Sequence, residues 1–229
     1  MKTAIMQPYF LPYLGYFQLM AAVDQFVVLD DVNFIKGGWL NRNRILSFGK
    51  VQWLTLPLSS ASSNRNICEI QLQLNEKFLK KTFRVIEGAY QKAPNFVEGM
   101  ELFHKLFEKP NSNLADFARE SLLMVADYLS LDCKITPRSS IFENQHLTGQ
   151  DRVLDICGRL STTTYINLPG GKEIYSSDRF SKQGIKLAYI VPQLPSYGAN
   201  FETGLSILDV IMNNSREDCQ KLARLVVTD

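Results

Sequence analysis

Several common function classes are excluded by what this sequence of 229 residues lacks. It has no GxxxxGKS/T loop and no GxGxxG fingerprint, which argues against Walker-type nucleotide binding and against a dinucleotide-binding domain. It has no GxSxG motif, so a hydrolase nucleophile elbow is excluded as well. Only two histidines are present, which rules out a multi-histidine metal site, and we predict no metal-ligand set.

The net charge, the lengths of the hydrophobic runs and the spacing of the cysteines narrow the possible classes of protein further. The net charge of +2 does not favour a protein that binds nucleic acid or a membrane surface. No apolar run approaches the roughly 20 residues that a membrane span needs, and the N-terminal run is interrupted at Gln7 and Pro8, so we expect no signal peptide. The four cysteines are far apart, which predicts reduced thiols in a cytoplasmic protein rather than zinc or disulfides.

The stretch from residue 4 to residue 44 predicts the unit around which the fold is built. Two apolar runs, Ala4–Met6 and Phe26–Leu29, flank a helical segment of about ten residues, as in a β–α–β unit with parallel strands. We therefore predict an α/β fold with a mostly parallel, Rossmann-like sheet. Ligands of such open sheets bind at the carboxyl ends of the strands, so a site is expected there.

The middle of the chain changes to a helical period. Apolar residues follow helical spacing in three segments between residues 75 and 131, and the α/β pattern returns at residue 133. This order predicts three parts. Residues 1–74 form the first part of the α/β domain, residues 75–131 a helical insertion subdomain, and residues 132–229 the second part of the α/β domain.

Polar and aromatic side chains gather after the predicted strands, and these are the candidate substrate-binding residues. The predicted set is Gln7, Tyr9, Tyr13, Asp31, Lys36, Trp39, Arg42, Asn43, Gly170, Gly171 and Tyr175. Lys36 and Arg42, both expected in a loop, suit a phosphate or carboxylate. Trp39 suits ring stacking or, alternatively, the core, and the alternative for Arg42 is a solvated face.

Asp30 and His146 are the candidate catalytic residues. Asp30 forms an acidic pair with Asp31 directly after a predicted strand, where paired carboxylates hold Mg²⁺ or a ligand hydroxyl. The same pair is equally suited to capping the turn that follows. His146 lies in a polar turn, and histidine suits general acid–base chemistry because it titrates near neutral pH. The alternative for His146 is a solvated turn residue.

Several of these motifs together resemble the WbqC-like family of bacterial proteins. The motifs are Gln7-Pro8-Tyr9-x-x-Pro12-x-x-Gly15-Tyr16-Phe17, Asp30-Asp31-Val32, Gly38-Trp39-x-Asn41-Arg42-Asn43, Thr164-Tyr165-Ile166, Gly170-Gly171 and Leu205-Ser206-Ile207-Leu208-Asp209. The resemblance covers essentially the whole chain, and the first two motifs are specific. Two departures affect the expected ligand: Tyr13 stands where a tryptophan is expected, and Gly198-Ala199-Asn200 replaces a segment that usually contains glutamine.

The resemblance implies a role in the biosynthesis of O-antigen and other surface polysaccharides. It implies a transferase that moves an aminoacyl or acyl group to a nucleotide-linked amino sugar. If the reaction starts from a free acid, ATP and Mg²⁺ are also implied, because a carboxylate has no adequate leaving group. The alternative is a non-catalytic sugar-nucleotide-binding or scaffold protein of the same machinery. A weaker likeness is to nucleotidyltransferase-like α/β folds, in which a histidine stands where this chain has Tyr16.

Overall fold

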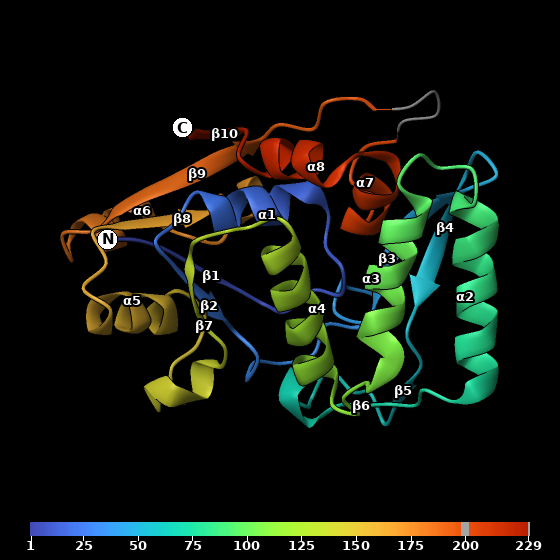
Figure 1. Ribbon diagram of the computed structural model, residues 1–229. Coiled ribbons are helices and arrows are strands. Elements are labelled where there is room, and N and C mark those ends of the chain that lie inside the picture. Colours follow the sequence, from blue (N-terminus) through green and yellow to red (C-terminus); the bar gives the residue numbers. More distant parts are fainter. Residues whose placement is uncertain (198–201, 229) are drawn as a thin grey trace.

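A computed structural model describes residues 1–197 and 202–228, and a six-stranded sheet lies at its centre (Figure 1). In spatial order its strands are β10 (Val226–Thr228), β9 (Lys186–Pro192), β8 (Thr164–Asn167), β1 (Lys2–Met6), β2 (Gln25–Val28) and β7 (Lys134–Thr136). The five strands from β9 to β7 are parallel, and β10 is antiparallel to β9. The predicted parallel pairing of the first two strands is confirmed. The departure at residues 198–200 lies outside the described residues.

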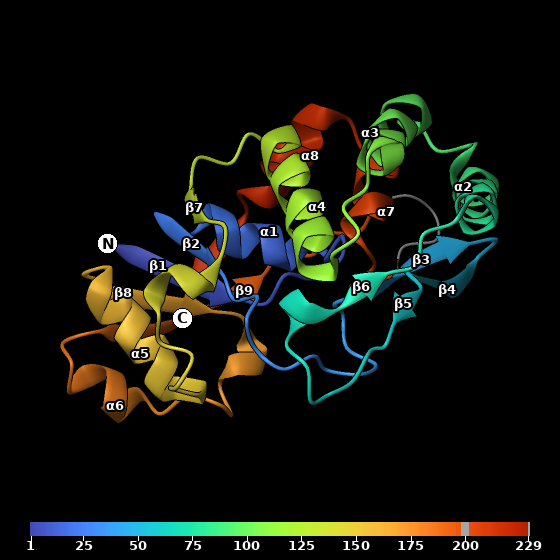
Figure 2. The same cartoon turned by 90° about the horizontal axis from the view of Figure 1, so that it is seen from below.

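Helices cover both faces of the sheet because successive residues of each strand point to opposite faces. On β1, Ala4 joins a core that includes side chains of α1 (Leu14–Ala21) and α8 (Arg216–Ala223). Its neighbour Ile5 joins a second core with α5 (Gly149–Arg159) and α6 (Ser177–Ser181). Figure 2 shows α5 and α6 together, apart from the helices of the middle of the chain. The central strand is therefore buried on both sides, as expected for a parallel sheet.

The three helices predicted between residues 75 and 131 are present. They are α2 (Glu76–Tyr90), α3 (Phe96–Glu108) and α4 (Leu114–Tyr128). Asn75 caps α2 by accepting a hydrogen bond from the Phe78 N–H at 2.9 Å, and Asn113 caps α4 in the same way. Their apolar side chains join the same core cluster as Ala4 of β1, so the helices pack onto the α/β part. That residues 75–131 form a separate subdomain stays a proposal.

A β-hairpin that the sequence pattern did not predict precedes these helices. It consists of β3 (Arg42–Ser47) and β4 (Lys50–Thr55), with Arg44 opposite Trp53. Both turn residues, Phe48 and Gly49, have positive φ angles, of 50° and 71°. Positive φ at both positions is typical of the type I′ turns that two-residue hairpins favour. The expectation that Arg42 lies in a loop is therefore wrong, since Arg42 is the first residue of β3.

The remaining elements are short and connect these parts. They are β5 (Leu58–Ser59), β6 (Gln71–Leu72), α7 (Ile207–Asn213) and the 3₁₀ turns η1 (Ile67–Glu69), η2 (Ser139–Phe142) and η3 (Pro169–Gly171). Within the described ranges, no helix has both the length and the hydrophobicity for a membrane span.

Candidate functional site

A cavity opens where the strand order of the sheet reverses. From β1 the chain adds β2 and β7 on one side, and it then crosses to add β8 and β9 on the other side. Open α/β sheets bind ligands at such a reversal, outside the carboxyl ends of the two strands that flank it. A cavity of about 760 Å³ lies at this place and is lined by residues of β1 and β8 and of the segments that follow both strands. We call it the switch-point pocket.

The pocket brings together most of the predicted substrate-binding residues. Those that line it are Gln7, Tyr9, Tyr13, Trp39, Asn43, Gly170, Gly171 and Tyr175. The two halves of the chain, about 160 residues apart in sequence, thus contribute to one cavity. Asp30, Asp31, Lys36, Arg42 and His146 are not among its lining residues. Sequence reasoning missed Arg44, Asn167, Ile35 and Ile174, which do line it.

The proline-rich loop after β1 forms one wall and is held by side chains from distant segments. Leu11 has a φ of +40°, which is strained for a residue with a branched side chain. Asn43 Nδ2 donates to the carbonyls of Phe10 and Leu11 at 3.1 and 2.7 Å, and Ser206 Oγ donates to the Leu11 carbonyl at 2.8 Å. The amide N–H groups of Asn43 are therefore used to hold the loop, although the side chain reaches the pocket.

Three tyrosines give the pocket neutral hydroxyl groups. Burial raises the pKa of Tyr9 and of Tyr175, and it raises the pKa of Tyr13 to about 12. The ordinary tyrosine pKa of 10.0 already keeps these groups protonated at neutral pH, and burial makes ionisation harder still, so all three are suited to donate hydrogen bonds rather than to act as bases. The ring of Tyr13 lies against Gly15 at the start of α1, where an added Cβ would be 2.5 Å from a ring carbon. Glycine at position 15 makes room for this ring.

The end of β8 forms the opposite wall, with closely fitted side chains. Asn167 donates to the Tyr165 hydroxyl at 3.1 Å, and that hydroxyl lies 3.4 Å from the hydroxyl of Tyr175. A Cβ added to Gly171 would lie 3.0 Å from Asn167 Nδ2 and 3.4 Å from the Tyr175 ring, whereas one added to Gly170 would meet nothing within 4 Å. Of the two glycines, only Gly171 is thus required by close packing.

Arg44 is the one charged side chain among the described residues that line the pocket. Its Nη2 donates to the Gly204 carbonyl at 3.1 Å, its Cζ lies 5.5 Å from the centre of the Trp39 ring, and its buried Nε has no hydrogen-bond partner. The sequence did contain a signal for Arg44. In a strand, residues two positions apart lie on the same face, so Arg44 shares a face of β3 with the predicted residue Arg42. Arg42 instead donates to the carbonyls of Gly37 and Gly38.

Asp30 and Asp31 lie in a buried cluster beside the pocket. We call Asp30, Asp31, Ser139 and Arg152 the acidic cluster. Arg152 Nη2 pairs with Asp31 Oδ1 at 2.6 Å, and both side chains are less than one tenth exposed. The Ser139 N–H donates to Asp30 Oδ1 at 3.0 Å, and the Ser139 hydroxyl contacts both carboxylates. These contacts join the end of β2 to Ser139, in the turn between β7 and α5, and to Arg152 of α5 itself.

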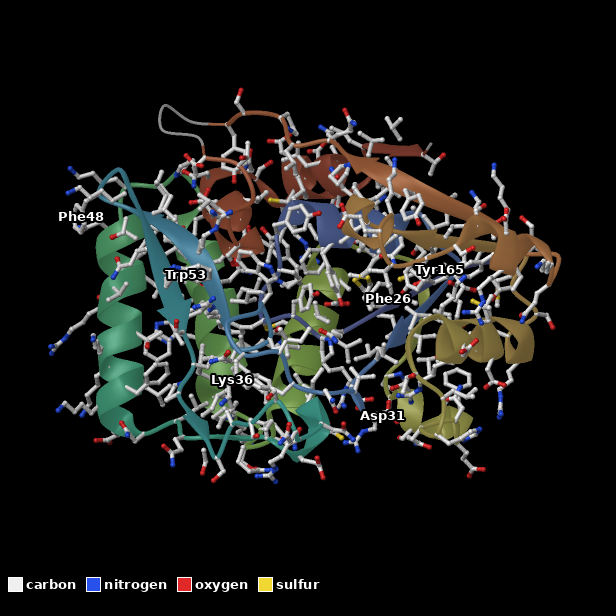
Figure 3. All side chains as sticks on the ribbon, turned by 180° about the vertical axis from the view of Figure 1, so that it is seen from behind. Phe26, Asp31, Lys36, Phe48, Trp53 and Tyr165 are labelled. Atoms are coloured by element: carbon white, nitrogen blue, oxygen red, sulfur yellow. The ribbon has the colours of Figure 1, made fainter. Side chains whose placement is uncertain are left out.

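The electrostatics of the acidic cluster suit a structural role. Burial raises the pKa of the Asp30 carboxyl, and the hydrogen bonds from Ser139 oppose that rise. The charge of Asp31 is compensated by the guanidinium of Arg152, which also donates from Nε to Asn144 Oδ1 at 3.0 Å. Figure 3 shows Asp31 apart from Trp53 of the hairpin. His146 and Lys36 are exposed in turns outside the pocket lining, and the functional roles predicted for these residues stay predictions.

Comparison with known proteins matches nearly the full length of the chain to one protein family. The model of the WbqC-like protein family matches residues 7–221. An uncharacterized protein of Mycobacterium tuberculosis (strain ATCC 25618 / H37Rv) is 26% identical over 222 residues, covering 94% of this chain and 95% of that protein. No solved structure matches the chain at a significant level.

Proposed function

The chain belongs to the WbqC-like protein family, and we propose that this member binds a nucleotide-linked amino sugar in the switch-point pocket. We propose further that it transfers an aminoacyl or acyl group to the sugar amine, as a step in the biosynthesis of a surface polysaccharide such as O-antigen. The observation that carries the proposal is the composition of the pocket. Among the described residues that line it, neutral amides and phenols that suit sugar hydroxyls share one cavity with a single guanidinium that suits a phosphate.

The protonation state of the pocket supports acyl transfer to an amine. The amine nitrogen attacks the carbonyl carbon of the donor, a C–N bond forms, and the bond from that carbon to the leaving group breaks. The leaving group departs with the bonding electrons, and the proton lost by nitrogen goes to the leaving group or to solvent. Negative charge develops on the carbonyl oxygen during attack. Tyr9, Tyr13 and Tyr175 line the pocket, and their phenol groups, which are protonated at neutral pH, are suited to donate hydrogen bonds to that oxygen.

The residues of the pocket do not fit Mg²⁺. Magnesium prefers carboxylate and other oxygen ligands, and the described lining residues include no aspartate or glutamate. The nearby Asp31 is paired with Arg152, and Asp30 accepts from Ser139. Among the described residues, no group of three or more histidine, cysteine, aspartate or glutamate side chains is placed to hold a metal. We therefore propose a donor that arrives already activated, such as a thioester.

A second candidate function has an observation in its favour. In the part of the chain that the structure describes, the pocket lining includes no histidine, cysteine, serine, lysine, aspartate or glutamate. It thus offers no ordinary pair of nucleophile and base. This favours the alternative of a sugar-nucleotide-binding or scaffold protein, in which the same pocket holds the ligand without reaction.

Two linked experiments test these functions. A thermal-shift series compares UDP-glucosamine, UDP-glucose, UDP and glucosamine, because a ligand that binds only the folded protein must stabilise it. We expect UDP-glucosamine to give the largest rise in Tm. The protein is then incubated with UDP-glucosamine and an acyl thioester such as acetyl-coenzyme A. Mass spectrometry then determines whether the mass of the sugar nucleotide has increased by that of the acyl group. An acylated product supports the transferase, whereas a rise in Tm without product supports the binding protein. No rise with any of the four compounds contradicts both.

A further inference from the structure

Both tryptophans of the chain lie in one row with two arginines at the edge of the pocket. The Cζ of Arg42 lies 4.1 Å from the centre of the Trp53 ring, and that ring lies 5.5 Å from the Trp39 ring with an angle of 34° between them. The Cζ of Arg44 lies 5.5 Å from the Trp39 ring. Trp39 and Arg44 line the pocket, whereas Trp53 and Arg42 do not. The row therefore runs from the pocket wall outward over the hairpin.

The fold holds Trp39 firmly at the pocket end of this row. Arg42 donates to the carbonyls of Gly37 and Gly38, which fastens the turn that carries Trp39 to the start of β3. The Trp39 carbonyl accepts from the Phe10 N–H at 3.0 Å, which ties the same turn to the proline-rich loop. The Trp53 ring, which does not line the pocket, packs against the Trp39 ring. A ring fixed in this way loses little conformational freedom when a ligand stacks on it.

The chemistry of the pocket differs between its two ends. The hairpin end presents the Trp39 ring and the Arg44 guanidinium, whereas the sheet end presents neutral groups of Gln7, Asn167 and Tyr175. A nucleoside diphosphate sugar has a matching series of parts. Its base needs a ring face, its diphosphate needs a cation, and its sugar needs neutral donors and acceptors. The ammonium form of an amino sugar is also repelled by Arg44, which favours the sheet end for the sugar.

We propose that Trp39 and Arg44 form the nucleotide end of the pocket. The base stacks on the pocket side of Trp39, the diphosphate binds Arg44, and the sugar points toward Gln7, Asn167 and Tyr175. The first turn of α1, where many nucleotide-binding folds hold phosphate, is here covered by the Tyr13 ring against Gly15. This inference rests on the proposed function and adds the orientation of the ligand to it.

The presence of only two tryptophans gives a direct test. In the variant Trp53→Phe, Trp39 is the sole tryptophan, and its emission is followed while UDP, UDP-glucosamine and glucosamine 1-phosphate are added in turn. We expect the two ligands with a base to quench the emission, and glucosamine 1-phosphate to bind without quenching it. In Trp39→Leu, the affinity for UDP by calorimetry should fall about tenfold or more, because the stacking contact is lost. The affinity for glucosamine 1-phosphate should change by less than about twofold.

The outcomes separate the inference from the function on which it rests. If UDP-glucosamine binds in calorimetry but neither quenches Trp39 nor loses affinity in Trp39→Leu, the orientation is wrong and the proposed function stands. Equal quenching by glucosamine 1-phosphate also overturns the inference, because the sugar rather than the base then lies at Trp39. If no sugar nucleotide binds the wild-type protein, the proposed function fails and the inference fails with it. Circular dichroism of both variants establishes that each is folded.

Discussion

Two neighbouring strand ends of this sheet carry polar side chains in very different states. At the ends of β1 and β8, Gln7, Tyr9 and Tyr175 border a cavity of about 760 Å³. At the end of β2, one strand away, Asp30 and Asp31 are buried in the acidic cluster with Ser139 and Arg152. Both groups follow parallel strands. The first group faces open space, whereas the second is paired within the protein except at Asp31 Oδ2, which has no hydrogen-bond partner.

This difference shows that a polar residue does not belong to a ligand site merely because it follows a parallel strand. A buried carboxylate is costly unless it is paired, and Arg152 and Ser139 supply the partners for the acidic cluster. The polar groups of the pocket keep capacity for a ligand because the strand order reverses there and leaves a gap between the two halves of the chain. We therefore assign structure to one strand end and binding to the other, and the following changes test that division.

The largest effect is expected from breaking the acidic cluster. Arg152→Ala leaves the buried charge of Asp31 without its partner and should lower the free energy of unfolding by about 3–5 kcal/mol. The matched control is Arg159→Ala on the same helix, whose ion pair with Asp155 is partly exposed (49% and 28% for the two side chains) and should cost less than about 1 kcal/mol. Urea denaturation measures both. Equal losses in the two variants would show that the cluster has no special structural role.

A large effect on binding, rather than on stability, is expected at the hairpin end of the pocket. Arg44→Gln removes a charge-assisted contact of about 1.5–3 kcal/mol, so the affinity for UDP should fall about ten- to a hundredfold. Lys36→Ala should change the affinity by less than about twofold, because Lys36 is exposed outside the pocket lining. Calorimetry compares the two. If Lys36→Ala lowers the affinity for UDP and Arg44→Gln does not, the phosphate binds at the exposed turn that carries Lys36, as the sequence pattern predicted.

A moderate effect is expected at the sheet end. Gly171→Ala forces Asn167 to shift, since the new Cβ would lie 3.0 Å from its Nδ2, and the affinity for glucosamine 1-phosphate should fall about three- to tenfold. Gly170→Ala is the matched control and should have no effect, because its Cβ meets nothing within 4 Å. Similar affinities of the two variants would mean that the sugar does not contact this wall.

The smallest effect is expected for Asp30→Asn. The pKa of Asp30 is raised above its ordinary value of 3.8, so the folded protein takes up this proton at a higher pH than the unfolded chain does. The contribution of Asp30 to wild-type stability should therefore fall as the pH rises from about 3.8 through the raised pKa, and the difference in stability between wild type and variant should change in the same way. Its affinity for UDP-glucosamine, with or without Mg²⁺, should stay within about twofold of wild type. A loss of affinity that appears only with Mg²⁺ would restore Asp30 as a metal ligand.

Much of the fold follows from short-range patterns. The parallel pairing of β1 with β2 and the helices α2 to α4 were predictable because each rests on apolar spacing within a few turns or strands. The β3–β4 hairpin was missed because its strand residues include Arg42, Asn43 and Arg44, which resemble a loop. Its turn, Phe48-Gly49, lacks the asparagine or aspartate that usually marks such hairpins.

The candidate site was predictable in outline for the same reason, since strand ends are visible in the sequence. The partners that distinguish the two strand ends are not visible there. Ser139 and Arg152 stand 109 and 121 residues from the acidic residues that they contact. The choice of Arg44 over Arg42 as the pocket arginine likewise depends on where the turn before β3 packs. Contacts at such separations are set by tertiary packing rather than by local sequence.

One measurement compares the two strand ends directly. Hydrogen–deuterium exchange of the wild-type protein, with and without saturating UDP-glucosamine, reports on peptides from both regions in one experiment. We predict slower exchange in peptides that cover residues 7–13 and 167–175, and unchanged exchange in peptides that cover residues 30–31 and 139–144. Protection of the second pair without the first would contradict the account, because the ligand would then lie at the acidic cluster rather than in the switch-point pocket.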